Sequence, residues 1–207
     1  MPDTNKAVTF ETLKARSPHS LTGSAKDAEA FLKTLFQEDE FICIGGVKNN
    51  HPCQVRSYLN RLDSLGEYIT INPFTPDTTR SDKNVAFYRH MLVEFDIADK
   101  EKAMADPVFL QQELEKQAGF WMAMLDKGVP IVSLTYSGSK SIHALFRVNV
   151  PDAATWKREI EGRVYPVFCK MGADPANKNP SRLSRMPMAL RGEVRQELLY
   201  LNPNVVP

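Results

Sequence analysis

The segment Met91-Leu-Val-Glu-Phe-Asp-Ile97 decides the fold, because it sets two acidic residues into an otherwise apolar run. In an extended strand successive side chains point to opposite faces, so Glu94 and Asp96 share one face, about 7 Å apart, and the apolar residues share the other. The plain alternative is a half-exposed strand whose acids are simply solvated. Acidic residues are poor strand formers, however, and they repel each other at this spacing unless a cation compensates. The segment therefore predicts a strand with a core face and a metal-binding face.

A second segment, Ser137-Gly-Ser-Lys-Ser-Ile-His-Ala-Leu-Phe-Arg-Val148, has a similar two-faced pattern. A strand over 141–150 places Ser141, His143 and Arg147 on one face and mainly apolar residues on the other. The stretch 138–141 superficially resembles a phosphate-binding loop, but the ATPase pattern requires Gly before the Lys and a helix after it. We therefore expect a hairpin here. A carboxylate pair near a Ser-x-His with basic neighbours indicates phosphoryl or nucleotidyl transfer.

Bulk composition is that of an ordinary globular domain. The 207 residues are 43% hydrophobic and 25% charged, which argues against the disordered, fibrous and membrane classes. The sequence lacks a signal-peptide pattern and any run approaching the ~18 apolar residues of a membrane span, so we expect a cytoplasmic protein with no membrane partner. The three cysteines are isolated, and neither a disulfide framework nor bound zinc is expected.

Positive charge is concentrated in the C-terminal part. The formal net charge is only +1, yet residues 139–195 hold eleven Lys and Arg against five Asp and Glu. Within this part, Arg182-Leu-Ser-Arg185 lies in a proline-flanked stretch and suits bidentate contacts to phosphate. The alternative is that these arginines pair with nearby acids. The distribution favours an anionic ligand at the C-terminal part.

The periodicity of the remaining chain predicts a mixed α/β protein. Residues 1–20 lack periodicity and are expected to form a loose lead-in, 75–83 an exposed loop in the position of a lid, and 173–191 an arginine-bearing loop. Helices are expected over 24–36, 54–65, 106–127 and 152–171, and further strands over 41–44, 68–71, 129–136 and 197–201. The last helix is expected to bury one apolar stripe, with Trp156 as a core residue: Trp156, Ile160, Val164, Val167, Phe168 and Met171.

Taken together, these motifs resemble the archaeo-eukaryotic primase superfamily, in particular the primase-polymerases of plasmid, phage and mobile-element replication. The family has an h-h-D/E-h-D strand, an S-x-H strand and a later acid near an arginine loop. The corresponding residues here are Leu92-Val-Glu-Phe-Asp96, Ser141-Ile-His143 and the segment from Asp174 to Pro187. Tyr68-Ile-Thr-Ile-Asn-Pro73 also resembles a strand-Asn-Pro element found before the first motif in some members.

The resemblance implies an α/β (α+β) fold in which an N-terminal α/β module, roughly 21–90, packs on a modified RNA-recognition-motif-like sheet, roughly 91–203, with the active site in the cleft between them. It implies Mg²⁺ or Mn²⁺, with two ions held by Glu94, Asp96 and Asp174. Glu193 or Glu197 remains an alternative to Asp174 as the third ligand. The nucleotide-binding residues that it implies, with His143 also catalytic, are Asn72, Ser137, Lys140, Ser141, His143, Arg182 and Arg185.

By the same resemblance, the implied function is a DNA primase or polymerase, with single-stranded DNA template, primer strand and dNTP or NTP as partners. A helicase or a C-terminal helical domain is a further expected partner, because many such proteins have one beyond the catalytic domain. Two alternatives stay open. A metal-dependent nuclease also needs clustered carboxylates, and a catalytically silent single-strand-binding module would show exposed aromatic residues on its sheet.

Overall fold

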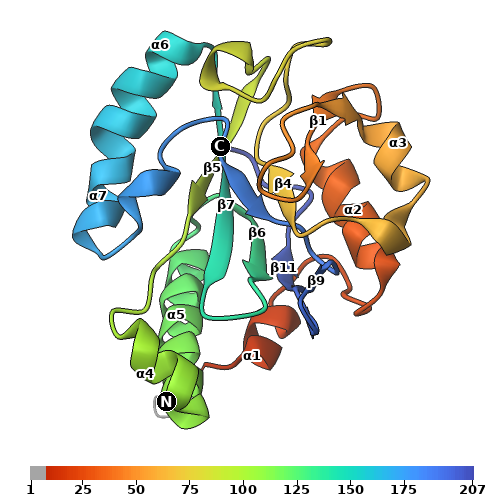
Figure 1. Cartoon of the computed structure of the whole chain (residues 1–207). Helices are drawn as coiled ribbons and strands as arrows, with labels where there is room; N and C mark the ends of the chain where they lie inside the picture. The colour runs from red at the N-terminus through yellow and green to blue at the C-terminus, as the bar shows by residue number, and fades with distance from the viewer. Residues whose placement is uncertain (1–7) are drawn as a thin grey trace.

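The computed structural model describes residues 8–207, and a four-stranded antiparallel sheet forms its centre (Figure 1). The strands lie in the order β11-β6-β7-β5. Register pairs Val93 with Ala144 on one side of β7 and Ala144 with Leu134 on the other. The hairpin expected between 129–136 and 141–150 is confirmed. The bounds are β5 Tyr88–Val93, β6 Ile131–Tyr136, β7 Ile142–Val150 and β11 Glu197–Leu201.

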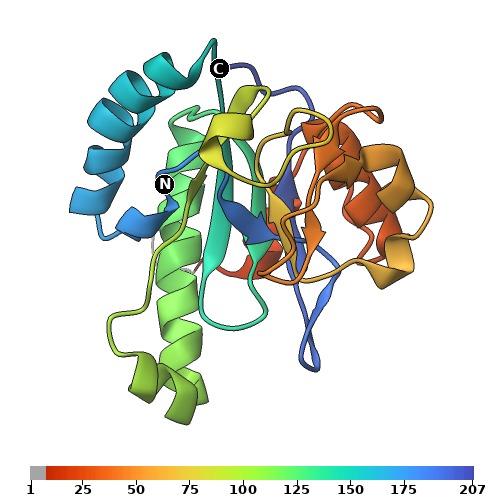
Figure 2. The ribbon, with the colours of Figure 1, turned by 45° about the horizontal axis from the view of Figure 1, so that its top comes forward.

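Helices cover one face of this sheet, and the N-terminal module covers the other (Figures 1 and 2). Successive residues of β5 show the division, since Leu92 packs with the N-terminal module and Val93 packs with the helical layer. The helical layer contains α1 Phe10–Ala15, α4 Lys100–Ala105, α5 Pro107–Asp126, α6 Ala153–Thr155, the π-helix Trp156–Val164 and α7 Tyr165–Lys170. The mixed α/β fold class is confirmed.

The N-terminal module has its own small sheet. Its three strands are antiparallel and lie in the order β2-β4-β8, so the module draws strands from both sides of residue 90. Two further pairs of short antiparallel strands, β1 with β3 and β9 with β10, complete the strands. The bounds are β1 Phe41–Ile42, β2 Ile44–Gly45, β3 Cys53–Gln54, β4 Tyr68–Thr70, β8 Leu183–Arg185, β9 Leu190–Arg191 and β10 Val194–Arg195, with α2 Ala25–Leu35, α3 Val55–Leu59 and 3₁₀ helices Leu62–Ser64, Asp82–Asn84 and Pro175–Asn177.

The loose lead-in expected over residues 1–20 is wrong for part of its length, and residues 1–7 lie outside the described residues. Residues 10–15 form α1, which begins at a capping box between Thr9 and Thr12. Leu13 is fully buried in the core beneath the sheet. A six-residue helix with one core residue gives too little periodicity to be recognised in the sequence.

The apolar stripe expected in the last helix is only partly buried. Trp156 and Ile160 are in the core, as expected, but Val164, Val167 and Met171 are exposed, and Tyr165 is buried instead. The cause is the π-helix over Trp156–Val164, whose wider turn shifts the phase of all later residues. The arginine-bearing loop over 173–191 is also corrected, because Leu183–Arg185 form β8 against β4.

Buried His90 predicts a measurable pH dependence of stability. Burial, followed by the nearby Arg147 guanidinium, lowers the pKa of His90 from 6.5 to about 3. Between these values the unfolded state holds the extra proton, so the free energy of unfolding should fall with falling pH, by at most about 1.4 kcal/mol per pH unit. His90→Asn should flatten this dependence between pH 6.5 and 4 in denaturant titrations. An unchanged slope would contradict the assignment.

None of the helices within residues 8–207 is long and apolar enough to cross a membrane.

Candidate active site

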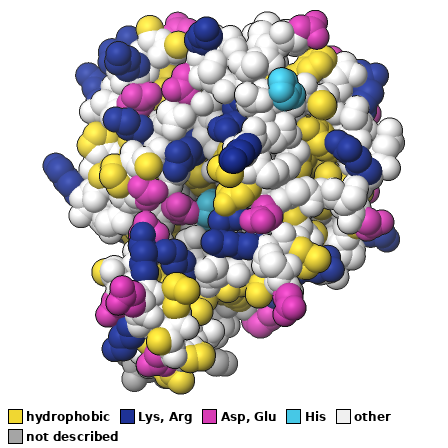
Figure 3. All heavy atoms as spheres, viewed as in Figure 1, with side chains coloured by type: hydrophobic (Ala, Val, Ile, Leu, Met, Phe, Trp, Pro, Cys, Tyr) yellow, Lys and Arg dark blue, Asp and Glu magenta, His cyan; other side chains and the backbone are white. Residues whose placement is uncertain are grey.

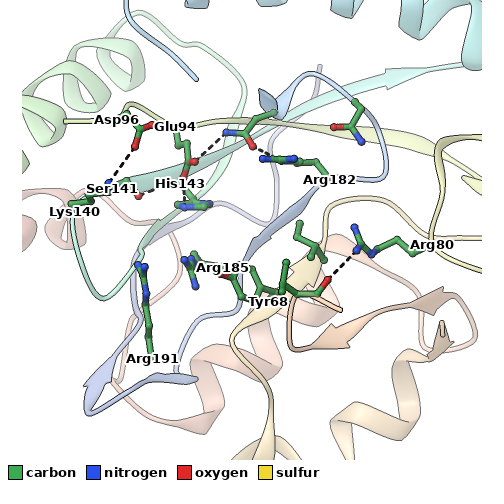
Figure 4. A pocket seen from close by; sticks show the side chains of 14 residues that line it. Tyr68, Arg80, Glu94, Asp96, Lys140, Ser141, His143, Arg182, Arg185 and Arg191 are labelled. Carbon is green, nitrogen blue, oxygen red and sulfur yellow. Dashed lines mark hydrogen bonds and ion pairs between the residues drawn. The ribbon is translucent and has the colours of Figure 1, made fainter. Parts of the chain in front are cut away.

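A cavity of about 410 Å³ lies between the end of β5, the β6–β7 turn and strand β8 (Figure 4). It is therefore located where the four-stranded sheet meets the small sheet of the N-terminal module. Figure 3, drawn in the view of Figure 1, shows charged side chains of both signs near the middle of the face turned to the viewer. Its charged lining consists of two carboxylates and five cations, together with His143: Glu94, Asp96, Arg80, Lys140, Arg182, Arg185 and Arg191.

Glu94 is the most densely contacted carboxylate of the cavity. Its Oε2 contacts His143 Nε2 and accepts from Ser141 Oγ at 3.4 Å, while its Oε1 accepts from Asn177 Nδ2 at 3.1 Å. Burial would raise the pKa of Glu94, but the charge and hydrogen bond of His143, the Asn177 amide and the Arg185 charge lower it to about 2. His143 Nδ1 lies 3.3 Å from Ser184 Oγ on β8. Glu94 is thus held as an ionised carboxylate in a fixed position.

Asp96 lies nearer to solvent, with 41% of its side chain exposed. Lys100 Nζ is 3.0 Å from one carboxylate oxygen, and Lys140 Nζ is 3.8 Å from the other. The strand expected over 91–97 ends at Val93, because Phe95 leaves β7 and bridges to Ala173. Glu94 and Asp96 nevertheless both line the cavity.

The β6–β7 turn carries Lys140 and Ser141 into the cavity. Ser137 closes the turn, because its amide donates to the Ser141 carbonyl at 2.9 Å and its Oγ accepts from the Ser141 amide at 3.2 Å. Gln117 on α5 also holds the turn, donating to the Lys140 carbonyl at 3.1 Å and accepting from the Ile142 amide at 2.9 Å. Ser137 is fully buried behind the cavity, so it positions Ser141.

Arg185 on β8 is the most buried cation of the cavity, with 7% of its surface exposed. Its guanidinium lies over the Tyr68 ring, 4.2 Å from the ring centroid, and its Nη1 donates to Glu67 at 3.1 Å. Among the described residues, its buried Nε has no hydrogen-bond partner. A largely desolvated guanidinium that lines the cavity is suited to binding an anion there.

The other arginines are anchored around Arg185. Arg182 Nε donates to Asn177 Oδ1 at 2.5 Å, so Asn177 links this arginine to Glu94. Arg80, from the loop expected over 75–83, donates to the Asn49 and Val47 carbonyls at 3.3 and 3.1 Å. Arg191 Nη1 lies 3.4 Å from the Ser137 carbonyl.

Asp174 lies beside this cavity and does not line it. Its amide donates to the Glu94 carbonyl at 3.0 Å. Its carboxylate accepts from the Ala176 amide at 2.9 Å, where it caps a 3₁₀ helix, and from Asn177 Nδ2 at 3.4 Å. Of the two alternatives, Glu197 pairs with Lys14 and Glu193 lies at the β9–β10 hairpin. Asp174 is therefore the acid that shares a contact, Asn177, with Glu94.

Asn72 has a structural position, which corrects the expectation that it contacts a nucleotide. It is fully buried. Its amide group donates to the carbonyls of His90 and Pro180, both at 3.0 Å, and accepts from the amides of Arg89 and His90. Both polar atoms of the Asn72 side chain are thus hydrogen-bonded to the backbone, and these bonds join β5 to the segment before β8. Arg147, on the same strand as His143, is likewise away from the cavity and donates to the Thr34 carbonyl at 3.2 Å.

The residues fit a hard divalent cation that would take some of its ligands from the protein and the others from water and a substrate. Within residues 8–207, no three His, Cys, Asp or Glu side chains are gathered as a metal-binding group. Mg²⁺, however, is commonly bound by one or two carboxylates together with waters and substrate phosphates. Glu94 and Asp96 supply two such carboxylates at one side of a cationic cavity.

Several lining residues were not expected from the sequence: Tyr68, Arg80, Asn177 and Arg191. Asn177 lies within the segment from Asp174 to Pro187, and Arg191 belongs to the basic C-terminal part, so the sequence contained a weak indication that both could lie at the site. Tyr68 and Arg80 come from the N-terminal module, and the packing of that module against the four-stranded sheet brings them to the site.

No protein-family model and no curated protein sequence matches the chain. Among solved structures, the AEP domain of the primase-polymerase (PrimPol) of cyanophage S-2L is similar, with a TM-score of 0.53 and 15% sequence identity. The match covers 88% of this chain and 93% of that domain. The chain therefore shares the fold of a primase-polymerase AEP domain over most of both proteins.

Proposed function

We propose that the protein is a template-dependent nucleotidyl transferase, a DNA primase or polymerase that adds nucleotides on single-stranded DNA. The observation that carries the proposal is the composition of one cavity, in which two carboxylates face five cations in a fold shared with a primase-polymerase domain. The carboxylates suit divalent cations, and the excess of cations suits a triphosphate, whose charge is larger than that of a single phosphodiester.

The nucleoside triphosphate would lie against the arginine side of the cavity. Arg185 lines this side with its guanidinium stacked on Tyr68, and Arg182 is held at the same side by Asn177. Guanidinium groups bind phosphate oxygens in a bidentate manner, so these two residues would orient the β- and γ-phosphates. Lys140 and Ser141, fixed by the turn that Gln117 anchors, would contact the phosphates from the opposite side.

Glu94 and Asp96 would hold Mg²⁺ or Mn²⁺, with Asp174 as a proposed third ligand of a two-ion site. When bound, the ions supply charge neutralisation of the triphosphate and a lowered pKa of the attacking hydroxyl. His143 positions Glu94 from one side and Asn177 from the other, so the carboxylate is ready to bind without rearrangement of the backbone.

In the reaction, the 3′-hydroxyl oxygen of a primer or initiating nucleotide attacks the α-phosphorus of the triphosphate. A new P–O bond forms, the bond between the α-phosphorus and the bridging oxygen breaks, and pyrophosphate leaves with that electron pair. The hydroxyl proton passes to solvent. Arg182, Arg185 and Lys140 would neutralise the charge that accumulates on the leaving pyrophosphate.

A metal-dependent nuclease would explain the two carboxylates but leaves the cluster of cations around them unaccounted for. An incubation with labelled single-stranded DNA, with and without primer, with all dNTPs or NTPs and with Mg²⁺ or Mn²⁺, separates the candidates. We expect a lengthened strand that requires both the metal and the triphosphates. A shortened strand would indicate the nuclease, and a bound but unchanged strand would indicate the silent binding module. Either result would overturn the proposal.

A further inference from the structure

A second pocket, of about 230 Å³, lies on the other side of Asp96 from the cationic cavity. Asp96 lines both spaces. The second pocket is formed by the residues that follow β5, by one face of α5 and by the end of α7. Phe95, Phe120, Met171 and Gly172 form one wall, and the polar side consists of Asp96, Glu113, Lys116 and Gln117. We call this space the aromatic pocket.

The aromatic rings of this pocket are held in place from behind. Phe95 and Phe120 meet edge to face, with centroids 4.7 Å apart, and fully buried Trp121 contacts both, at 5.2 and 4.9 Å. Both phenylalanines are only partly buried, so part of each remains open to the pocket. The pocket thus has a rigid aromatic wall, which is the type of surface on which nucleobases stack.

Met171 completes the pocket because of the π-helix. A regular α-helix would have kept Met171 on the buried stripe with Trp156, whereas the shifted phase leaves it 51% exposed. Lys116 and Glu113 also line the pocket and form an ion pair with each other, so Lys116 would exchange this partner for a phosphodiester. On the cavity side of Asp96, Lys140 lies 3.8 Å from its carboxylate.

We propose that the aromatic pocket binds the nucleobase of the nucleotide that supplies the attacking 3′-hydroxyl, either the primer end or the initiating nucleotide. This inference rests on the proposed function, because that reaction requires two nucleotides to meet at one carboxylate site. The triphosphate requires the cationic cavity. The attacking nucleotide would then approach Asp96 from the other side, where the flat face of its base can stack on Phe95 or Phe120.

The test compares two exposed apolar residues. Met171→Glu places a charge in the pocket, whereas Val167→Glu makes the same kind of change on α7 at a residue that is 50% exposed and outside the pocket. In primer extension, Met171→Glu should raise the KM for the primer by about 10-fold, the scale of one base-stacking contact, and leave the KM for the dNTP unchanged. Val167→Glu should behave as the wild type. Equal effects of both variants, or a raised dNTP KM alone, would overturn the inference.

A second measurement does not depend on catalysis. A primer annealed to a template and ending in photoreactive 4-thiothymidine is irradiated with the wild-type protein, and the adduct is located by mass spectrometry. The adduct should fall on Phe95, Phe120 or Met171, and an adduct elsewhere, or none, would overturn the inference. If the protein adds no nucleotide but the adduct lies in the aromatic pocket, the proposed function fails and the nucleobase site stands. If it adds nucleotides and the adduct lies elsewhere, only the nucleobase site fails.

Discussion

Asp96→Asn is expected to reduce nucleotide incorporation by on the order of 10³-fold or more, because metal ions supply several kcal/mol of charge stabilisation in such reactions. The amide keeps the size of the side chain and removes the charge that would hold the cation. The fold should survive, because 41% of the Asp96 side chain is exposed and its ion pairs with Lys100 and Lys140 are at the surface. We expect the free energy of unfolding to change by less than about 1 kcal/mol.

The matched control for this substitution is Asp99→Asn. Asp99 is exposed, lies three residues away and caps α4, a position at which asparagine serves as well as aspartate. Single-turnover rates of primer extension in Mn²⁺ and in Mg²⁺ give the comparison, with calorimetric titration of Mn²⁺ as a readout that needs no catalysis. A folded Asp96→Asn protein that extends primers within about 10-fold of the Asp99→Asn control would contradict the role given to Asp96, since the expected loss is several kcal/mol.

Arg185→Lys should raise the KM for the nucleoside triphosphate by about 10- to 100-fold, the effect of losing a hydrogen bond between charged groups. Lysine keeps the positive charge, but it has neither the Nε donor nor the planar group that stacks on Tyr68. The metal dependence of the rate should stay as in the wild type, since Arg185 is placed at the phosphates and not at the cation.

Arg195→Lys is the control, because Arg195 is exposed, lies outside the cavity and donates to the Met188 carbonyl at 3.3 Å. Initial rates against triphosphate concentration, with thermal melts of each variant, separate a binding effect from a loss of fold. If Arg185→Lys melts early, Arg182→Lys tests the same phosphate contact from a less buried residue of the cavity. Unchanged KM values in both variants would place the triphosphate elsewhere.

The parts of the fold that follow from local periodicity were predictable. The alternation of polar and apolar residues through 141–150 and the capped helix after Ser24 can be recognised from residues close together in the sequence. Both elements are present in the structure. The three-residue strand β8 was not predictable, because it exists only through its pairing with β4, over a hundred residues earlier. The phase of the last helix was also misjudged, since the wider π-helical turn has no recognised sequence signal here.

The same division holds in the site. Glu94, Asp96, Ser141 and His143 lie in two adjacent strands or at their ends, so their approach follows from the pairing of β5 with β7. Tyr68 and Arg80 reach the cavity only because the N-terminal module packs against that sheet. Asn72 matched a short motif, but its surroundings in the folded chain use every polar atom of its side chain for backbone contacts.

Template-directed incorporation is the most direct test of nucleotidyl transfer at this cavity. Four single-stranded templates that differ at one templating base are each supplied with primer, Mg²⁺ or Mn²⁺ and one labelled triphosphate at a time. The wild-type protein should add the complementary nucleotide on each template, and Asp96→Asn should add none. No addition by the wild type, addition that ignores the template base, or a shortened strand would contradict the proposed function.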